Sequence, residues 1–195
     1  SDVSEEEQTA RDDELSDRLA GDARVTLDYL ERLAATDTIL GFRSALDLER
    51  VGILGHSRGG STVTRGCATD RRLRACAVLD NIGSAPETDT GLQKPQLAVR
   101  ASWSEERESR LARFLSVNPR PAFDVEVAGA THMSFTDAPL VDPESHPPGE
   151  LEPGTAHRTV SRVLLGFLDE YLRGEEGGFR RSVIELGPAV EMREF

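Results

Sequence analysis

Residues 51–60, Val-Gly-Ile-Leu-Gly-His-Ser-Arg-Gly-Gly, decide how the rest of the chain can fold. The first four are mostly apolar, which is typical of a short, fully buried parallel strand. A Gly-x-Ser-x-Gly motif centred on Ser57 follows, and a helix-like stretch then continues to Ala68. A strand, a tight turn and a helix are the setting in which this motif marks a nucleophile elbow. We therefore predict that Ser57 is a catalytic nucleophile in an α/β fold.

The glycines around Ser57 fit a strained turn. A side chain at positive φ is tolerated only where its neighbours are small, and Gly55 and Gly59 supply that room. Gly60 allows the helix to begin close to the strand. The backbone N–H of Arg58, at the start of the helix, then faces any negative charge that develops beside the serine. We expect this N–H to be an oxyanion donor.

Length and charge limit the kind of protein. The chain has 195 residues and a formal net charge of −12. This length suits one domain with a sizeable core, and the charge argues against nucleic acid or an anionic membrane surface as a partner. No apolar run reaches the roughly 18 residues that a membrane-spanning helix needs, so we expect no membrane span.

The chain contains two cysteines, Cys67 and Cys76. Cys67 falls on the predicted helix after the elbow, and Cys76 falls on the next predicted strand. Two cysteines do not make a disulfide framework, so we favour buried free thiols and keep a single bridge as the alternative. Neither cysteine has metal-ligand spacing with a histidine, and we expect no metal site.

Composition and apolar spacing divide the chain into three parts. Residues 1–13 are acidic and nearly free of apolar side chains, which predicts a solvated arm or linker. Residues 14–178 alternate helix-like and strand-like segments, as an α/β sheet requires. The tail, 179–195, includes a possible short strand at 182–186. The predicted helices are 15–34, 60–68, 105–117 and 155–172, and the predicted strands are 51–54, 75–79, 96–100 and 123–127, the last at the sheet edge because its side chains alternate.

A serine nucleophile needs a base that accepts its proton and an acid that holds the base. His132 lies in the loop after the last predicted parallel strand. The order Ser, Asp, His at strand ends favours His132 as the base. His56 adjoins Ser57, but the tight turn should direct its side chain away, while His146 and His157 look like surface residues.

Two acidic positions compete for the third role. Asp80 ends the buried strand after the elbow, where an unpaired carboxylate would be unfavourable. Glu105 follows the next strand along the chain. Asp137 belongs to the same loop as His132 and is too close in sequence to be the first choice. We prefer Asp80 as the acid and keep Glu105 as the alternative.

Four segments, 55–60, 70–75, 78–80 and 131–137, together resemble the platelet-activating-factor acetylhydrolase-like branch of the α/β-hydrolases. That branch is similar to dienelactone-hydrolase-like and cutinase-like enzymes. The resemblance covers about residues 15–175 and implies a three-layer α/β-hydrolase sandwich with a mostly parallel sheet. It also implies an acid just after the strand that follows the elbow, which is where Asp80 stands.

The resemblance has one departure. In the family, several strands and a helix precede the segment that corresponds to residue 15, and they carry a second oxyanion donor. The resemblance therefore implies that this chain is the carboxyl-terminal part of a longer protein, or that another chain completes the sheet. Either arrangement would cover an edge or face of the sheet that is otherwise exposed.

These features predict a serine hydrolase that cleaves carboxylic esters through an acyl-enzyme on Ser57. The resemblance implies short-acyl or lipid-like ester substrates, and the chemistry requires no metal or organic cofactor. Two alternatives stay open. One is a catalytically impaired binding or assembly module, and the other is a thioesterase or peptidase on the same scaffold.

Overall fold

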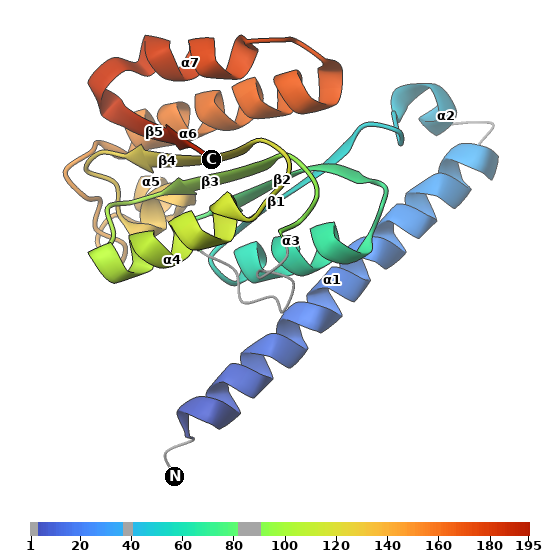
Figure 1. Cartoon of the computed structure of the whole chain (residues 1–195), viewed down its shortest axis with the longest axis horizontal. Coiled ribbons are helices and arrows are strands. Elements are labelled where there is room, and N and C mark those ends of the chain that lie inside the picture. The colour runs from blue at the N-terminus through green and yellow to red at the C-terminus, as the bar shows by residue number, and fades with distance from the viewer. Residues whose placement is uncertain (1–3, 37–40, 82–90) are drawn as a thin grey trace.

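A computed structural model describes residues 4–36, 41–81 and 91–195 of the chain. A five-stranded sheet with the order β1-β2-β3-β4-β5 forms its centre (Figure 1). The first four strands run parallel, and β5 pairs antiparallel with β4. The strands are β1 (Val51–His56), β2 (Leu73–Leu79), β3 (Gln96–Arg100), β4 (Ala122–Val127) and β5 (Val190–Glu194).

Helices cover both faces of this sheet and complete three layers (Figure 1). Helices α1, α3 and α4 lie on one face, and α6 and α7 lie on the other. The α-helices are α1 (Glu5–Thr36), α2 (Phe42–Ala45), α3 (Arg58–Thr69), α4 (Glu105–Ser116), α5 (Ala138–Val141), α6 (Pro153–Leu168) and α7 (Gly178–Leu186). Shorter helical turns are η2 (His132–Phe135), η3 (Asp169–Arg173) and η4 (Gly187–Ala189).

The alternation of side chains along β2 explains why both faces need cover. Ala75 and Ala77 join the apolar cluster under α6 and α7, whereas Cys76 and Val78 join the cluster under α3 and α4. Successive residues of a strand point to opposite faces. A strand that is apolar at every position therefore has to be buried on both sides, as the sequence predicts for 75–79.

The predicted acidic arm, 1–13, is wrong from Glu5 onward, because these residues form the first turns of α1. Charge partners far along the chain explain the difference. Asp12 forms an ion pair with Arg58 at 2.6 Å, and Asp13 forms one with Arg65 at 2.6 Å. Both arginines belong to α3, so the acidic residues hold α1 against the elbow helix.

The predicted edge position of 123–127 is also wrong. All but one residue of β4 are buried, because β5 pairs along its outer side. Asp124, which gives the segment its alternating pattern, is 1% exposed and bonds Arg100 and Arg193. A buried carboxylate that is paired with arginines can occupy an interior strand.

The tail contains a strand, but not at the predicted residues 182–186. Those residues belong to α7, where Phe179 and Val183, four positions apart, both face the core. That spacing is helical. The strand comes later, at Val190–Glu194, where Val190 and Met192 pack on the core from alternate positions.

Strand β1 is less buried than its sequence predicts. Within the described residues its only neighbouring strand is β2, and Leu54 is 50% exposed. One side of β1 is therefore an open edge in this part of the chain, as the resemblance implied.

Cys67 and Cys76 form a disulfide, which corrects the preference for free thiols. The sequence placed Cys67 on the elbow helix and Cys76 on the next strand, and the structure packs that helix across that strand. Their Cα atoms lie 6.4 Å apart, within the usual range for a disulfide. Both side chains are buried.

Candidate active site

Ser57 occupies a strained turn between β1 and α3. Its φ is 55°, in a region that side chains rarely adopt. The turn is fixed on both sides, because the Ser57 N–H donates to the Leu79 carbonyl at 2.9 Å and the Asn81 amide donates to the Ser57 carbonyl. Such strain persists only where the surrounding contacts impose it.

Two of the three glycines in this turn are required for close packing. A Cβ on Gly55 would lie 2.3 Å from the carbonyl oxygen of Gly59, and a Cβ on Gly60 would lie 2.7 Å from the Cβ of Asn81. A Cβ on Gly59 would meet open space. The sequence argument was therefore correct for Gly55 and Gly60. Gly59 differs, because its backbone lies close to Gly55 but its own position has room for a side chain.

His132 reaches Ser57 from the loop after β4. Its Nε2 lies 3.0 Å from the Ser57 Oγ. His132 opens the 3-10 turn η2, which is capped by reciprocal hydrogen bonds between Thr131 and Ser134. Phe135, at the end of that turn, is buried in the core. The cap and this apolar anchor together fix where the imidazole lies.

Asp80 lies on the other side of the His132 ring. Its Oδ2 accepts a hydrogen bond from the His132 Nδ1 at 2.6 Å. Its Oδ1 accepts from the Ala101 N–H at 3.0 Å and from the Trp103 Nε1–H at 2.7 Å. The residue is 5% exposed. Hydrogen bonds to both oxygens compensate for the burial of this carboxylate.

The structure brings Ser57, His132 and Asp80 together and leaves the alternative acid apart. Glu105 begins α4 and is exposed, and the Nδ1 of His132 bonds Asp80 instead. Asp137 pairs with His157 at 3.3 Å, on the surface. The three residues therefore have the connections that proton transfer from a serine hydroxyl requires, from hydroxyl to imidazole to carboxylate.

His56 lies nearer to the site than the sequence suggested. Its Nε2–H donates to the carbonyl oxygen of His132 at 2.8 Å, and the two ring centres are 4.5 Å apart. Its ring also stacks on Phe135. Burial and then the nearby His132 hold the pKa of His56 below its usual value. A neutral His56 thus braces the backbone that carries His132.

Two residues at the site escaped the sequence argument: Asn81 and Trp103. The tryptophan comes three residues after β3, and a polar-tipped aromatic at a strand end is a signal that could have indicated it. Asn81 directly follows the predicted acid. Their partners lie more than 20 positions away in the chain, so no local pattern identifies the contacts.

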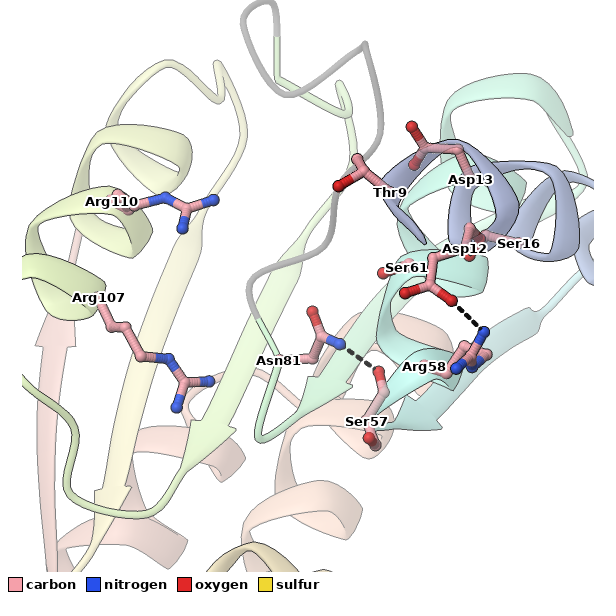
Figure 2. Close-up of a pocket in the computed structure, with 10 residues that line it drawn as sticks. All are labelled: Thr9, Asp12, Asp13, Ser16, Ser57, Arg58, Ser61, Asn81, Arg107 and Arg110. Atoms are coloured by element: carbon pink, nitrogen blue, oxygen red, sulfur yellow. Dashed lines mark hydrogen bonds and ion pairs between the residues drawn. The ribbon is translucent and has the colours of Figure 1, made fainter. Parts of the chain in front are cut away.

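The backbone of Arg58 begins α3 directly after Ser57. The first N–H groups of a helix have no partner within the helix, so this N–H is free to face a developing negative charge. The Arg58 side chain turns toward α1 and pairs with Asp12 (Figure 2). The guanidinium is thus held away from the serine hydroxyl.

A pocket of about 440 Å³ opens beside Ser57 (Figure 2). Helices α1, α3 and α4 and the residue after β2 contribute to its walls. The residues that line it are Thr9, Asp12, Asp13, Ser16, Ser57, Arg58, Ser61, Asn81, Arg107 and Arg110. Its size is in the range of small-molecule sites.

Two kinds of feature are absent from the described ranges. No group of three or more histidine, cysteine, aspartate or glutamate side chains there could hold a metal ion. In those same ranges, no helix is long and apolar enough to cross a bilayer.

Comparisons with known proteins show which proteins this chain is similar to. The family described as "Platelet-activating factor acetylhydrolase, isoform II" matches residues 29–179. A platelet-activating factor acetylhydrolase from Gallus gallus is 27% identical over 139 residues, which cover 67% of this chain and 33% of that protein. The solved structure of a ferulic acid esterase from Streptomyces cinnamoneus is 24% identical, with a TM-score of 0.72 over 93% of this chain and 55% of that chain.

The chain therefore spans 33% of the length of the avian relative and 55% of the length of the esterase. The likeness to the esterase, together with the mostly parallel sheet between two helical layers, confirms the predicted α/β-hydrolase fold.

Proposed function

The chain belongs to the platelet-activating factor acetylhydrolase isoform II family, and on this basis we propose that it is a serine hydrolase that cleaves carboxylic esters. The observation that carries the proposal is the position of His132, whose two ring nitrogens lie 3.0 Å from the Ser57 hydroxyl and 2.6 Å from the Asp80 carboxylate. This is the geometry that an activated serine needs.

In the proposed first step, the Ser57 Oγ attacks the ester carbonyl carbon while the Nε2 of His132 accepts the hydroxyl proton. Asp80 accepts a hydrogen bond from the Nδ1–H, which keeps the imidazole in the useful tautomer and stabilises its charged form. The Arg58 N–H donates to the oxyanion that forms on the carbonyl oxygen. His132 then gives its proton to the leaving alcohol, and an acyl-enzyme remains on Ser57.

In the second step, His132 removes a proton from water, and the resulting nucleophile attacks the acyl carbon. The acid is released and Ser57 regains its proton. The relatives are an acetylhydrolase and an esterase by name, which supports ester substrates with short or lipid-like acyl groups. No step requires a metal or an organic cofactor.

A fluorophosphonate probe tests this proposal directly, because it labels activated serines. The wild-type protein should take up the probe and hydrolyse 4-nitrophenyl acetate, and Ser57→Ala should do neither. Ser61→Ala is the matched control, because Ser61 also lines the pocket, whereas the imidazole of His132 contacts the hydroxyl of Ser57. Equal labelling of the wild-type protein and Ser57→Ala would overturn the proposal.

A further inference from the structure

The pocket beside Ser57 has two walls that differ in their ion pairs. On the wall formed by α1 and α3, the carboxylates of Asp12 and Asp13 pair with Arg58 and Arg65. The opposite wall belongs to α4 and carries two arginines (Figure 2). Neither of these arginines forms an ion pair with any residue in the described part of the chain, and both are exposed.

These two arginines, Arg107 and Arg110, occupy adjacent turns of α4, and their guanidinium groups extend toward the pocket (Figure 2). The chain has a net charge of −12, and other arginines, such as Arg65 and Arg72, form ion pairs with carboxylates of α1. Two cations without an ion pair in the described part of the chain, on the wall of the pocket beside Ser57, therefore form a local positive region, to which an anion is attracted.

Arg107 is also held in place. Its guanidinium lies 4.0 Å from the centre of the Trp103 ring, a cation–π contact. The Nε1–H of that ring donates to the Oδ1 of Asp80 at 2.7 Å. The position of the guanidinium is thus tied, through one aromatic ring, to the carboxylate that holds His132.

We propose that Arg107 and Arg110 determine substrate specificity by binding a negatively charged group of the ester, a carboxylate or a phosphate, at a distance from the scissile bond. This inference rests on the proposed ester hydrolase function. Planar guanidinium groups match carboxylate and phosphate oxygens through paired hydrogen bonds. The pocket has a volume of about 440 Å³ in all, with these arginines on one wall and Ser57 on another, which gives room for the rest of such a molecule.

Two pairs of esters test the proposal and separate its two sources of charge. Monoethyl glutarate is compared with its neutral carboxamide analogue, and 2-acetoxyethyl phosphate is compared with its neutral dimethyl ester. The readout is the ratio of kcat/KM for the charged ester to kcat/KM for its neutral partner. Using this ratio removes any general loss of activity that a variant suffers.

The test variant is Arg107→Gln/Arg110→Gln. The control is Arg113→Gln/Arg120→Gln, which removes the same charge from exposed positions outside the pocket, one of them on the same helix. We expect the ratio to fall about tenfold for at least one pair of esters in the test variant, the effect of one lost charge-assisted hydrogen bond, and less than about twofold in the control.

Arg107→Lys/Arg110→Lys should recover part of the ratio, because the charge returns without the planar fork. The loss should appear mainly in KM if the charged group is bound equally before and during the reaction. Ratios that fall equally in test and control variants, or in neither, for both pairs of esters would overturn the inference. Failure of the proposed function looks different, because wild-type protein would then hydrolyse none of the four esters.

Discussion

Two buried aspartates in the same sheet, on strands separated by β3, have opposite surroundings. Asp124, in the middle of β4, is 1% exposed and bonds the guanidinium groups of Arg100 and Arg193. Asp80, at the end of β2, is 5% exposed, and its partners are an imidazole, an indole and a backbone N–H. One carboxylate is neutralised by permanent cations, and the other is not.

Under the proposed function, this difference separates a structural role for Asp124 from a catalytic role for Asp80. Burial lowers the pKa of Arg100, but its hydrogen bond and ion pair with Asp124 outweigh burial, and the pKa is raised overall. The guanidinium of Arg100 therefore keeps its charge. Asp80 can instead stabilise a positive charge that exists only while His132 holds the proton from Ser57. Burial of a carboxylate alone therefore does not indicate chemistry; the nature of its partners does.

The largest expected effect comes from Asp80→Asn. The amide nitrogen would favour the wrong tautomer of His132, and we expect kcat for an ester to fall by about 10⁴-fold. The melting temperature should stay close to that of the wild-type protein. Turnover near the wild-type value would show that catalysis does not depend on the Asp80 carboxylate.

Asp124→Asn should act on stability instead. It leaves Arg100, which is 2% exposed, without the most deeply buried of its carboxylate partners, and we expect a loss of about 3 kcal/mol in the free energy of unfolding. Urea denaturation measures this, with Glu14→Gln as an exposed control. Activity per folded molecule should not change. A loss of kcat without a loss of stability would mean that the two aspartates share a role.

His56→Phe tests the hydrogen bond that His56 donates to the backbone carbonyl of His132. Phenylalanine keeps the stacking on Phe135 but removes the hydrogen bond to the His132 carbonyl. We expect kcat to fall by about tenfold, in line with the loss of one hydrogen bond. Steady-state kinetics at neutral pH measures this.

The same variant has a pH signature. The pKa of His56 is lowered in the folded protein, so below about pH 6.5 the unfolded chain binds a proton that the folded chain does not. The wild-type protein should therefore lose stability relative to His56→Phe as the pH falls through this region, and not above it. Parallel unfolding curves at pH 8 and pH 5 compare the two proteins. An equal difference at both pH values would contradict a neutral, half-buried His56.

The smallest effect is expected for Glu105→Gln. This residue competed with Asp80 in the sequence argument, but it is exposed at the start of α4. We expect kcat/KM to change by less than about twofold, as for most surface substitutions. A loss as large as that of Asp80→Asn would show that the acid comes from the other strand end.

The sequence predicts the parts of this protein that depend on local patterns. The elbow around Ser57, the parallel strands and the acid at the end of β2 all follow from apolar runs and from residues at strand ends. His132 follows because the chemistry requires a histidine and few positions can supply one. Local patterns and chemical necessity thus identified all three residues that the structure brings together.

The parts that sequence reasoning missed depend on pairs of distant residues. The helical start of α1 needs Arg58 and Arg65, about 50 positions further along, to balance its acidic side chains. The burial of β4 needs Arg193, which lies 69 positions away from Asp124. A solvated arm and an exposed strand have the same local composition as these segments, so only the folded chain distinguishes them.

The disulfide between Cys67 and Cys76 has a practical consequence. It joins the helix that follows Ser57 to the strand that precedes Asp80, and both cysteine side chains are buried. A reductant can attack them only when that helix separates from that strand. The rate at which thiols appear in dilute reductant would therefore report how often α3 separates from β2. This measurement needs no label on the protein.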